Sequence, residues 1–169
     1  MQDNCMEDKN RTLLENLDDP RSCVCFLLSR AAQTAQKHLR NMLEPYGLTP
    51  AQYLIMECLW ICDRLSPKEI AELLRLDSAT LTGLIDRLER LGFVTRERDL
   101  KDRRAIRVCL TGRSSDMKEE LRAVRIRANE EILSIFGEKE RERLKSDLAA
   151  LISADEQMAP ISWDKKQEK

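Results

Sequence analysis

The chain has 169 residues, of which 42% are hydrophobic, 35% are charged and 4% are aromatic. This length allows one sizeable core and is too short for two large domains, and this composition favours long amphipathic helices over a β-sandwich or barrel. The formal net charge of −1 excludes the strongly basic body expected of a protein that coats nucleic acid without specificity. We find no signal-like opening and no apolar stretch near the roughly 20 residues that span a bilayer. We therefore expect a cytoplasmic protein without a membrane partner.

The first half of the chain predicts three helices behind an acidic arm, residues 1–19. Asp19-Pro20 offers a capping residue followed by proline at the first helical position, so we expect a helix from there to Gly47. Thr49-Pro50-Ala51-Gln52 and Ser66-Pro67-Lys68-Glu69 are both capping boxes. They predict a largely apolar helix from Pro50 to about Cys62 and a short helix after Ser66.

The second half predicts another helix, a charged hairpin and two further helices. Asp77 is the expected cap of a helix over 78–91, which Gly92 ends in a left-handed conformation. Alternating apolar residues then predict two strands, 94–98 and 106–110, joined by a tip over 99–104. From Gly112 an apolar pattern of four- and three-residue steps predicts one long helix broken at Gly137, followed by a last helix. The expected fold is mostly α with a small two- or three-stranded β wing.

Residues 48–110 have the order helix, turn, helix, hairpin, which is that of a winged helix-turn-helix DNA-binding domain. A helix enters the major groove only if its exposed face is small or polar near its N-terminus. Arginines on a hairpin tip suit the minor groove and the phosphates, and Asp102 could hold a neighbouring guanidinium in a fixed pose. The candidate DNA-contacting residues are Ser66, Ser78, Ala79, Thr80, Thr82, Gly83, Arg87, Arg96, Arg98, Lys101, Asp102, Arg103 and Arg104.

The helices predicted over 20–47 and 111–152 carry more apolar surface than a winged helix needs to cover its own core. We interpret them as a dimerisation region on a two-fold axis, with a polar tail over 153–169. A homodimer presents two reading helices to double-stranded DNA and so predicts a pseudo-palindromic operator. The alternative interpretation is that these helices only cover the chain's own core.

The chain resembles the multiple-antibiotic-resistance regulator (MarR) family over Cys23 to Ile152. The resemblance implies winged helix-turn-helix dimers that usually repress transcription and release DNA when a small ligand or an oxidant acts. It makes the helix from Asp77 the recognition helix, and Arg104, oriented by Asp102, the residue for the minor groove. The segments that carry the resemblance are Leu48 to Tyr53, Ser66 to Leu74, Asp77 to Val94, and Asp102 to Thr111.

The resemblance implies two kinds of signal. The commoner effector in the family is a phenolic or aromatic acid, which Leu39, Leu43, Tyr53, Met56 and Trp60 could line, although an apolar stripe at these spacings is also plain core.

Cys25-Phe26-Leu27-Leu28 resembles the cysteine segment of the organic-hydroperoxide-sensing branch, which makes Cys25 a candidate redox sensor; Leu39 and Pro50 stand where that branch has tyrosines. Cys23 and Cys25, two positions apart on the predicted helix, should face nearly opposite ways. With His38 alone and no C-x-x-C pair, we expect no metal site and no cofactor.

Two other functions remain open on the sequence. The winged-helix dimer could be a protein–protein interaction module without specific DNA binding, and steep salt dependence of duplex binding would separate it from a regulator. A thiol peroxidase would need an activated cysteine with supporting donors, and the sequence offers none. We therefore expect no enzymatic activity.

Overall fold

The computed structural model describes residues 19, 22–99, 102 and 104–156, so most of the predicted N-terminal arm, Pro20 and residues 157–169 lie outside it. The described part is mostly helical with one antiparallel two-stranded sheet, which confirms the predicted fold class. In chain order its elements are α2 (Val24–Leu43), the 3-10 turn η2 (Glu44–Tyr46), α3 (Pro50–Ile61), α4 (Pro67–Leu74), α5 (Ser78–Arg90), β1 (Val94–Arg98), β2 (Ile106–Leu110), α6 (Gly112–Asp116), α7 (Lys118–Ile132), the 3-10 turn η3 (Leu133–Ile135) and α8 (Glu138–Glu156).

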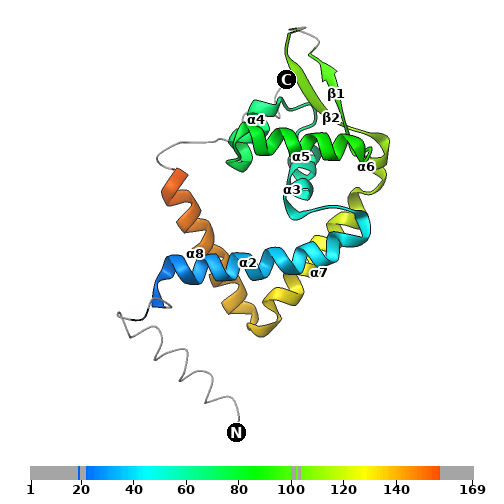
Figure 1. Ribbon diagram of the computed structural model, residues 1–169. Coiled ribbons are helices and arrows are strands. Elements are labelled where there is room, and N and C mark those ends of the chain that lie inside the picture. Colours follow the sequence, from blue (N-terminus) through cyan, green and yellow to red (C-terminus); the bar gives the residue numbers. More distant parts are fainter. Residues whose placement is uncertain (1–18, 20–21, 100–101, 103, 157–169) are drawn as a thin grey trace.

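The elements gather at two ends of the molecule (Figure 1). Helices α3, α4 and α5 and the β1–β2 hairpin lie together at one end, whereas α2, α7 and α8 make up the other. Helix α2 packs along α7, and α3 contacts both α2 and the elements of the winged end. None of the helices in the described part is long and apolar enough to cross a membrane.

The first described helix begins later than predicted. The carbonyl of Asp19 accepts hydrogen bonds from the backbone N–H of Ser22 at 2.9 Å and from its hydroxyl at 2.8 Å. These two hydrogen bonds make a local turn at Asp19. Helix α2 begins only at Val24, with Cys23 as its N-cap. At the other end, Gly47 ends the segment as predicted, with a left-handed φ of 68° after η2.

Both predicted capping boxes are present. In α3 the Gln52 side chain accepts from the backbone N–H of Thr49 at 2.9 Å, and in α4 the Glu69 side chain accepts from that of Ser66 at 2.8 Å. Asp77 caps α5 through the backbone N–H of Thr80 at 2.8 Å. These caps satisfy backbone donors that would otherwise be unpaired and fix where each helix begins.

The end of α5 also follows the prediction. Gly92 has a φ of 74°, a conformation that L side chains rarely adopt. The backbone N–H of Phe93 then donates to the carbonyl of Leu88 at 2.9 Å, and Phe93 is fully buried. The chain therefore leaves α5 directly into β1.

The long helix predicted from Gly112 is wrong as a single element, because Met117 separates α6 from α7. The carbonyl of Ser114 accepts from the indole N–H of Trp60 at 3.3 Å, and the buried Ser114 hydroxyl donates to the carbonyl of Phe93. These two contacts hold α6 against the winged end. At its other end α7 tightens into η3 before Gly137.

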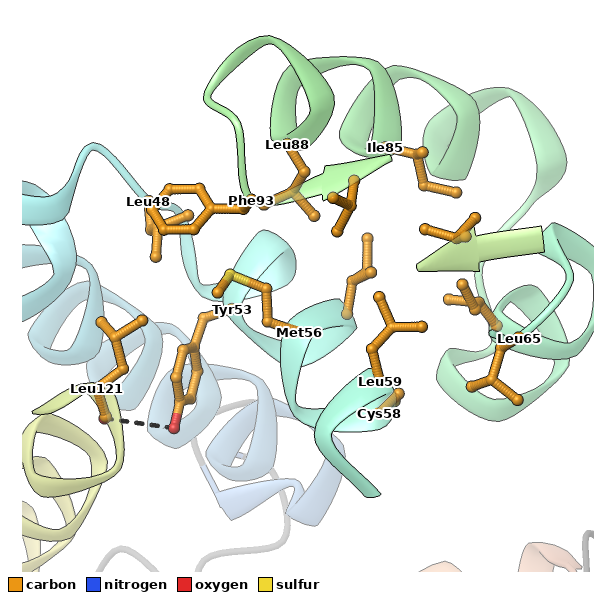
Figure 2. Close-up of a cluster of buried hydrophobic side chains, with 14 of the residues drawn as sticks. Leu48, Tyr53, Met56, Cys58, Leu59, Leu65, Ile85, Leu88, Phe93 and Leu121 are labelled. Atoms are coloured by element: carbon orange, nitrogen blue, oxygen red, sulfur yellow. Dashed lines mark hydrogen bonds between the residues drawn. The ribbon is translucent and has the colours of Figure 1, made fainter. Parts of the chain in front are cut away.

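The core is centred on α3, α5 and the hairpin, and Leu121 of α7 also packs into it (Figure 2). The α5 stripe of Leu81, Ile85 and Leu88 is buried, as predicted, and Val108 of β2 is buried with it. Each such side chain contributes about 1.5–3 kcal/mol on burial. Beside the two strands of the wing, Leu65 forms a single-residue bridge with Val108. The backbone N–H of Val108 donates to the carbonyl of Leu65 at 2.8 Å.

Candidate nucleic-acid interface

The N-terminal half of α5 presents a small, polar face to solvent. Its exposed members there are Ser78, Ala79, Thr80, Thr82 and Gly83, with Arg87 one turn further. Nothing lies within 4 Å of a Cβ built on Gly83, so this face is open. Because the opposite stripe of α5 is buried, the exposed face points away from the protein as a reading helix requires.

The hydroxyls of this face are held by local contacts. Thr80 donates to the carboxylate of Asp77 at 2.6 Å, and Thr82 donates to the carbonyl of Ser78 at 2.7 Å. The Thr80 hydroxyl and backbone N–H lower the pKa of Asp77, which therefore stays ionised as a cap. Ser66, at the start of α4, is half-buried and donates to Glu69 at 2.9 Å.

Arg96 joins the wing to the reading helix. Its guanidinium contacts Asp86 of α5 at 2.6 Å and the carboxylate of Glu89, and its backbone N–H also donates to Glu89 at 3.2 Å. The sequence interpretation placed Arg96 among the DNA-contacting residues. In the structure two carboxylates of α5 pair with its guanidinium, so Arg96 is placed to hold the wing against α5.

Arg107 makes a similar joint between the wing and α4. Its guanidinium contacts Asp99 at 2.5 Å and Glu69 at 2.8 Å. Arg64, in a left-handed conformation with φ of 63°, lies beside it and pairs with Glu97 at 2.6 Å. Together the two arginines connect α4, the α3–α4 loop and both strands.

The wing tip is shaped by carboxylates that accept backbone hydrogen bonds. Asp102 accepts from the backbone N–H of Arg104 at 2.9 Å and donates its own N–H to Asp99 at 3.1 Å. Asp102 therefore fixes the backbone of Arg104. The sequence had predicted that it would fix a neighbouring guanidinium instead. Lys101 and Arg103 lie outside the described residues.

Three candidate cations remain available to a ligand. Arg87, Arg98 and Arg104 are exposed, and within the described ranges their guanidinium groups have no ion pair. They lie on α5, at the end of β1 and at the wing tip. Helix α5 and the wing thus offer positive charge at separate positions.

The five residues predicted to line an effector pocket belong to one hydrophobic core, but they do not line a single cavity. Leu43 and Met56 are completely buried in the core. Leu39 lines a cavity of about 610 Å³ between α2, α3, α4 and α7, whereas Tyr53 and Trp60 line another of about 180 Å³ between α3 and α7. Among the described residues that line the larger cavity, the charged ones are Arg40 and Arg125.

The cysteine pair at the start of α2 differs from the prediction. Cys23 is the N-cap, with an extended backbone (φ −62°, ψ 124°), so helical rotation does not separate it from Cys25. The nearby backbone N–H groups of Phe26 and Cys25, and then the Cys25 thiol, favour the thiolate and lower the pKa of Cys23. Both thiols are exposed, and the pKa of Cys23 is lowered, whereas the sequence interpretation chose Cys25 as the candidate sensor.

The other described cysteines have the opposite character. Burial raises the pKa of Cys58 to about 11, and burial likewise raises that of Cys109. A search of the described residues finds no group of three His, Cys, Asp or Glu that could hold a metal ion.

Comparison with known proteins decides the family. The MarR family profile matches residues 48–106. The organic hydroperoxide resistance transcriptional regulator of Bacillus subtilis is 34% identical over 129 residues, which cover 76% of this chain and 86% of that protein. This chain belongs to the MarR family of transcriptional regulators. The HTH-type transcriptional regulator TtmR of Methylorubrum extorquens is 41% identical over 104 residues, and the match spans only 53% of that longer relative.

Solved structures of MarR-family proteins share the fold. A probable transcriptional regulator from Pseudomonas aeruginosa superposes with a TM-score of 0.73 at 28% identity, over 80% of this chain and 99% of that one. A mutant MarR from E. coli complexed with operator DNA gives a TM-score of 0.69 at 24% identity, over 74% of this chain and 90% of that one. The relatives named above are transcriptional regulators by name.

Proposed function

We propose that two copies of this chain bind one pseudo-palindromic operator and repress transcription in the cytoplasm. The single observation that carries the proposal is the N-terminal face of α5, which is exposed, small and polar while its opposite face is buried. In each copy α5 enters a major groove, and the wing tip reaches the adjacent minor groove.

Each candidate residue then has a role. Ser78, Ala79, Thr80, Thr82 and Gly83 lie against the bases and the nearest phosphates, and Arg87 reaches a base edge or the backbone. Arg104 enters the minor groove, while Arg98, Lys101 and Arg103 follow phosphates. Ser66, Asp102 and Arg96 position these groups through the cap of α4, the wing-tip turn and the joint between β1 and α5.

Exposed apolar side chains support the homodimer. In the single chain, α2 exposes Val24 and Phe26, and α8 exposes Leu151 and Ile152, each above 40% of its surface. Such surface on helices at the end opposite α5 suits burial against a second copy. We therefore assign 20–47 and 111–152 to dimerisation, 48–110 to DNA binding, and 1–19 and 153–169 to flanking arms.

Two signals could release the operator. A small aromatic acid fits the larger cavity, because Leu39, Leu54 and Leu74 give it apolar walls and Arg40 offers a cation. Oxidation of the exposed Cys23–Cys25 pair is the second, supported by the lowered pKa of Cys23 and by the relative named for organic hydroperoxide resistance. Both places lie at least partly on α2, in the proposed dimerisation region.

The test is selection of the preferred site from random duplexes, followed by titration of the selected site. We expect a two-fold symmetric sequence bound at least a thousandfold more tightly than random duplex, and a steep loss of affinity between about 50 and 200 mM salt. If no sequence outcompetes random duplex at low salt, the protein–protein module is the better function.

A further inference from the structure

Two arginines and three carboxylates link the wing to α4 and to the loop between α3 and α4. Arg107 of β2 contacts Asp99, which follows β1, at 2.5 Å and Glu69 of α4 at 2.8 Å. Arg64, in the loop, contacts Glu97 of β1 at 2.6 Å. Each of these contacts joins two parts of the winged end, so the choice of partners decides how the wing is held.

The register of the hairpin offers Arg107 one further partner. Glu97 lies directly opposite Arg107 in the antiparallel pair of β1 and β2, and opposite charges at such positions attract each other. Among the described residues, however, Arg107 contacts Asp99 and Glu69, and the Glu97 carboxylate pairs with Arg64. Arg107 therefore keeps its two contacts beside a carboxylate that could compete for its guanidinium.

The backbone of the loop places Arg64 for its contact with β1. Arg64 has a φ of 63°, a left-handed conformation that L side chains rarely adopt. The residues on either side of it are tied to β2. The Asp63 carboxylate accepts from the backbone N–H of Leu110 at 3.0 Å, and the Leu65 carbonyl accepts from that of Val108 at 2.8 Å. A strained residue held from both sides points to a role for its side chain.

We propose that Arg64 is a positioning residue that keeps Glu97 from competing for Arg107. While Arg64 pairs with Glu97, Arg107 stays on Asp99 and Glu69, and the hairpin stays attached to α4. Without the Arg64 side chain, the Glu97 carboxylate has lost its partner and attracts the guanidinium that faces it. Arg107 then leaves Asp99, Glu69 or both.

This exchange of partners reaches DNA through the wing tip. Asp99 accepts from the backbone N–H of Asp102 at 3.1 Å, and Asp102 accepts from that of Arg104 at 2.9 Å. A displaced Asp99 therefore moves the backbone that presents Arg104 to the minor groove. In this step the inference rests on the proposed function, because the groove contact of Arg104 belongs to that proposal.

The experiment introduces Glu97→Gln in two backgrounds. Arg64→Gln alone should weaken binding of the selected operator about tenfold, a loss of the size expected for one misplaced DNA contact. Glu97→Gln in that background removes the competing carboxylate and should restore the affinity to within about twofold of the parent. In the parent protein, Glu97→Gln should raise the affinity about twofold at most, since Arg107 keeps its partners there. An ion pair that only stabilised the fold would give no rescue.

A matched control separates this rescue from net charge. Glu97→Gln restores the charge that Arg64→Gln removes, and added positive charge favours binding to DNA in general. Glu72→Gln restores the same charge on α4, where Glu72 is 57% exposed and lies 3.9 Å from Lys68. It should change the affinity of the Arg64→Gln protein by about twofold at most.

Two further checks concern the backbone and the fold. Arg64→Gly removes the side chain and also relieves the left-handed backbone, and it should weaken operator binding as much as Arg64→Gln. Arg64 and Glu97 are 40% and 45% exposed, so their variants should fold, and far-ultraviolet circular dichroism measures this.

A measurement without DNA follows the exchange itself. In full-length protein with isotope-labelled arginine, Arg107→Lys assigns the Nε–H resonance of Arg107, whose acceptor in the structure is Asp99. We expect this resonance to shift in Arg64→Gln, because its acceptor changes. It should return to its original position in the double variant Arg64→Gln, Glu97→Gln.

The proposal is overturned if Glu97→Gln fails to rescue Arg64→Gln, if Glu72→Gln rescues it equally well, or if the Arg107 resonance stays in place in Arg64→Gln. Failure of the proposed function is a different result, in which the parent protein prefers no duplex sequence. The resonance of Arg107 then decides by itself whether Arg64 governs its partners.

Discussion

Arg96 holds the wing against α5 through ion pairs. We therefore expect a variant that loosens these ion pairs to affect DNA binding differently from a variant that removes a phosphate contact. The double variant Arg96→Gln, Glu89→Gln removes a cation and a carboxylate together and leaves the net charge unchanged. The Arg96 side chain is 28% exposed and its partners Asp86 and Glu89 are 51% and 38% exposed, so solvent screens both ion pairs. We expect the free energy of unfolding to fall by about 1–2 kcal/mol.

The effect on DNA binding follows from the same geometry. If about 1 kcal/mol of that loss is needed to hold the wing in its bound orientation, operator affinity falls about fivefold. The salt dependence should not change, because no phosphate contact is lost. Arg98→Gln is the contrasting variant, since the loss of one phosphate contact per copy should reduce the slope of log K against log salt by about 1.8 for the dimer.

Fluorescence anisotropy of a labelled operator between about 50 and 300 mM salt measures both quantities. Parallel lines for the parent and the Arg96 double variant would support a positioning role. A slope reduced as far as that of Arg98→Gln would refute the reasoning and return Arg96 to the phosphate backbone.

Three further variants probe other parts of the molecule. Arg104→Ala should weaken operator binding at least about tenfold while thermal unfolding stays unchanged, since its side chain is exposed. Leu88→Ala should lower the unfolding free energy by about 2–5 kcal/mol in urea, because Leu88 is completely buried. Cys23 should be alkylated faster than buried Cys58 at neutral pH, and its rate should rise with pH through a midpoint below that of an ordinary cysteine, because nearby backbone N–H groups lower its pKa. Site-resolved mass spectrometry reads both, and Cys23→Ser provides the control.

Much of the fold could be predicted because it depends on local chemistry. The caps at Thr49, Ser66 and Asp77, and the left-handed Gly92, are set by residues within four positions of one another. The break at Met117 could not be predicted in this way. It depends on Trp60 and Phe93, which are 54 and 21 positions from Ser114 in the sequence.

In the candidate interface, too, features that depend on nearby residues could be predicted, and features that depend on distant residues could not. The exposed face of α5 follows from periodicity alone, since Leu81, Ile85 and Leu88 determine which residues point outward. The partners of Arg96 do not, because seven and ten residues separate it from Glu89 and Asp86. One signal was present: Arg96 follows buried Val94 at a two-residue step, which puts it on the inward face of β1, where a guanidinium requires a partner.

These joints bear on how a signal could reach DNA. Arg96 holds β1 to α5, and Arg107 holds β2 to α4, so the winged end should move as one body. Its described polar contacts with α7 are the Tyr53 hydroxyl near the carbonyl of Leu121 at 3.4 Å and the contact of Glu57 with Arg125, while Leu121 and Val124 of α7 pack into the same core. An effector in the larger cavity contacts Arg125, and with it the connection between the winged end and α7. Because two reading helices must match two half-sites at a fixed separation, we expect a small rotation at this connection to release the operator without deforming α5.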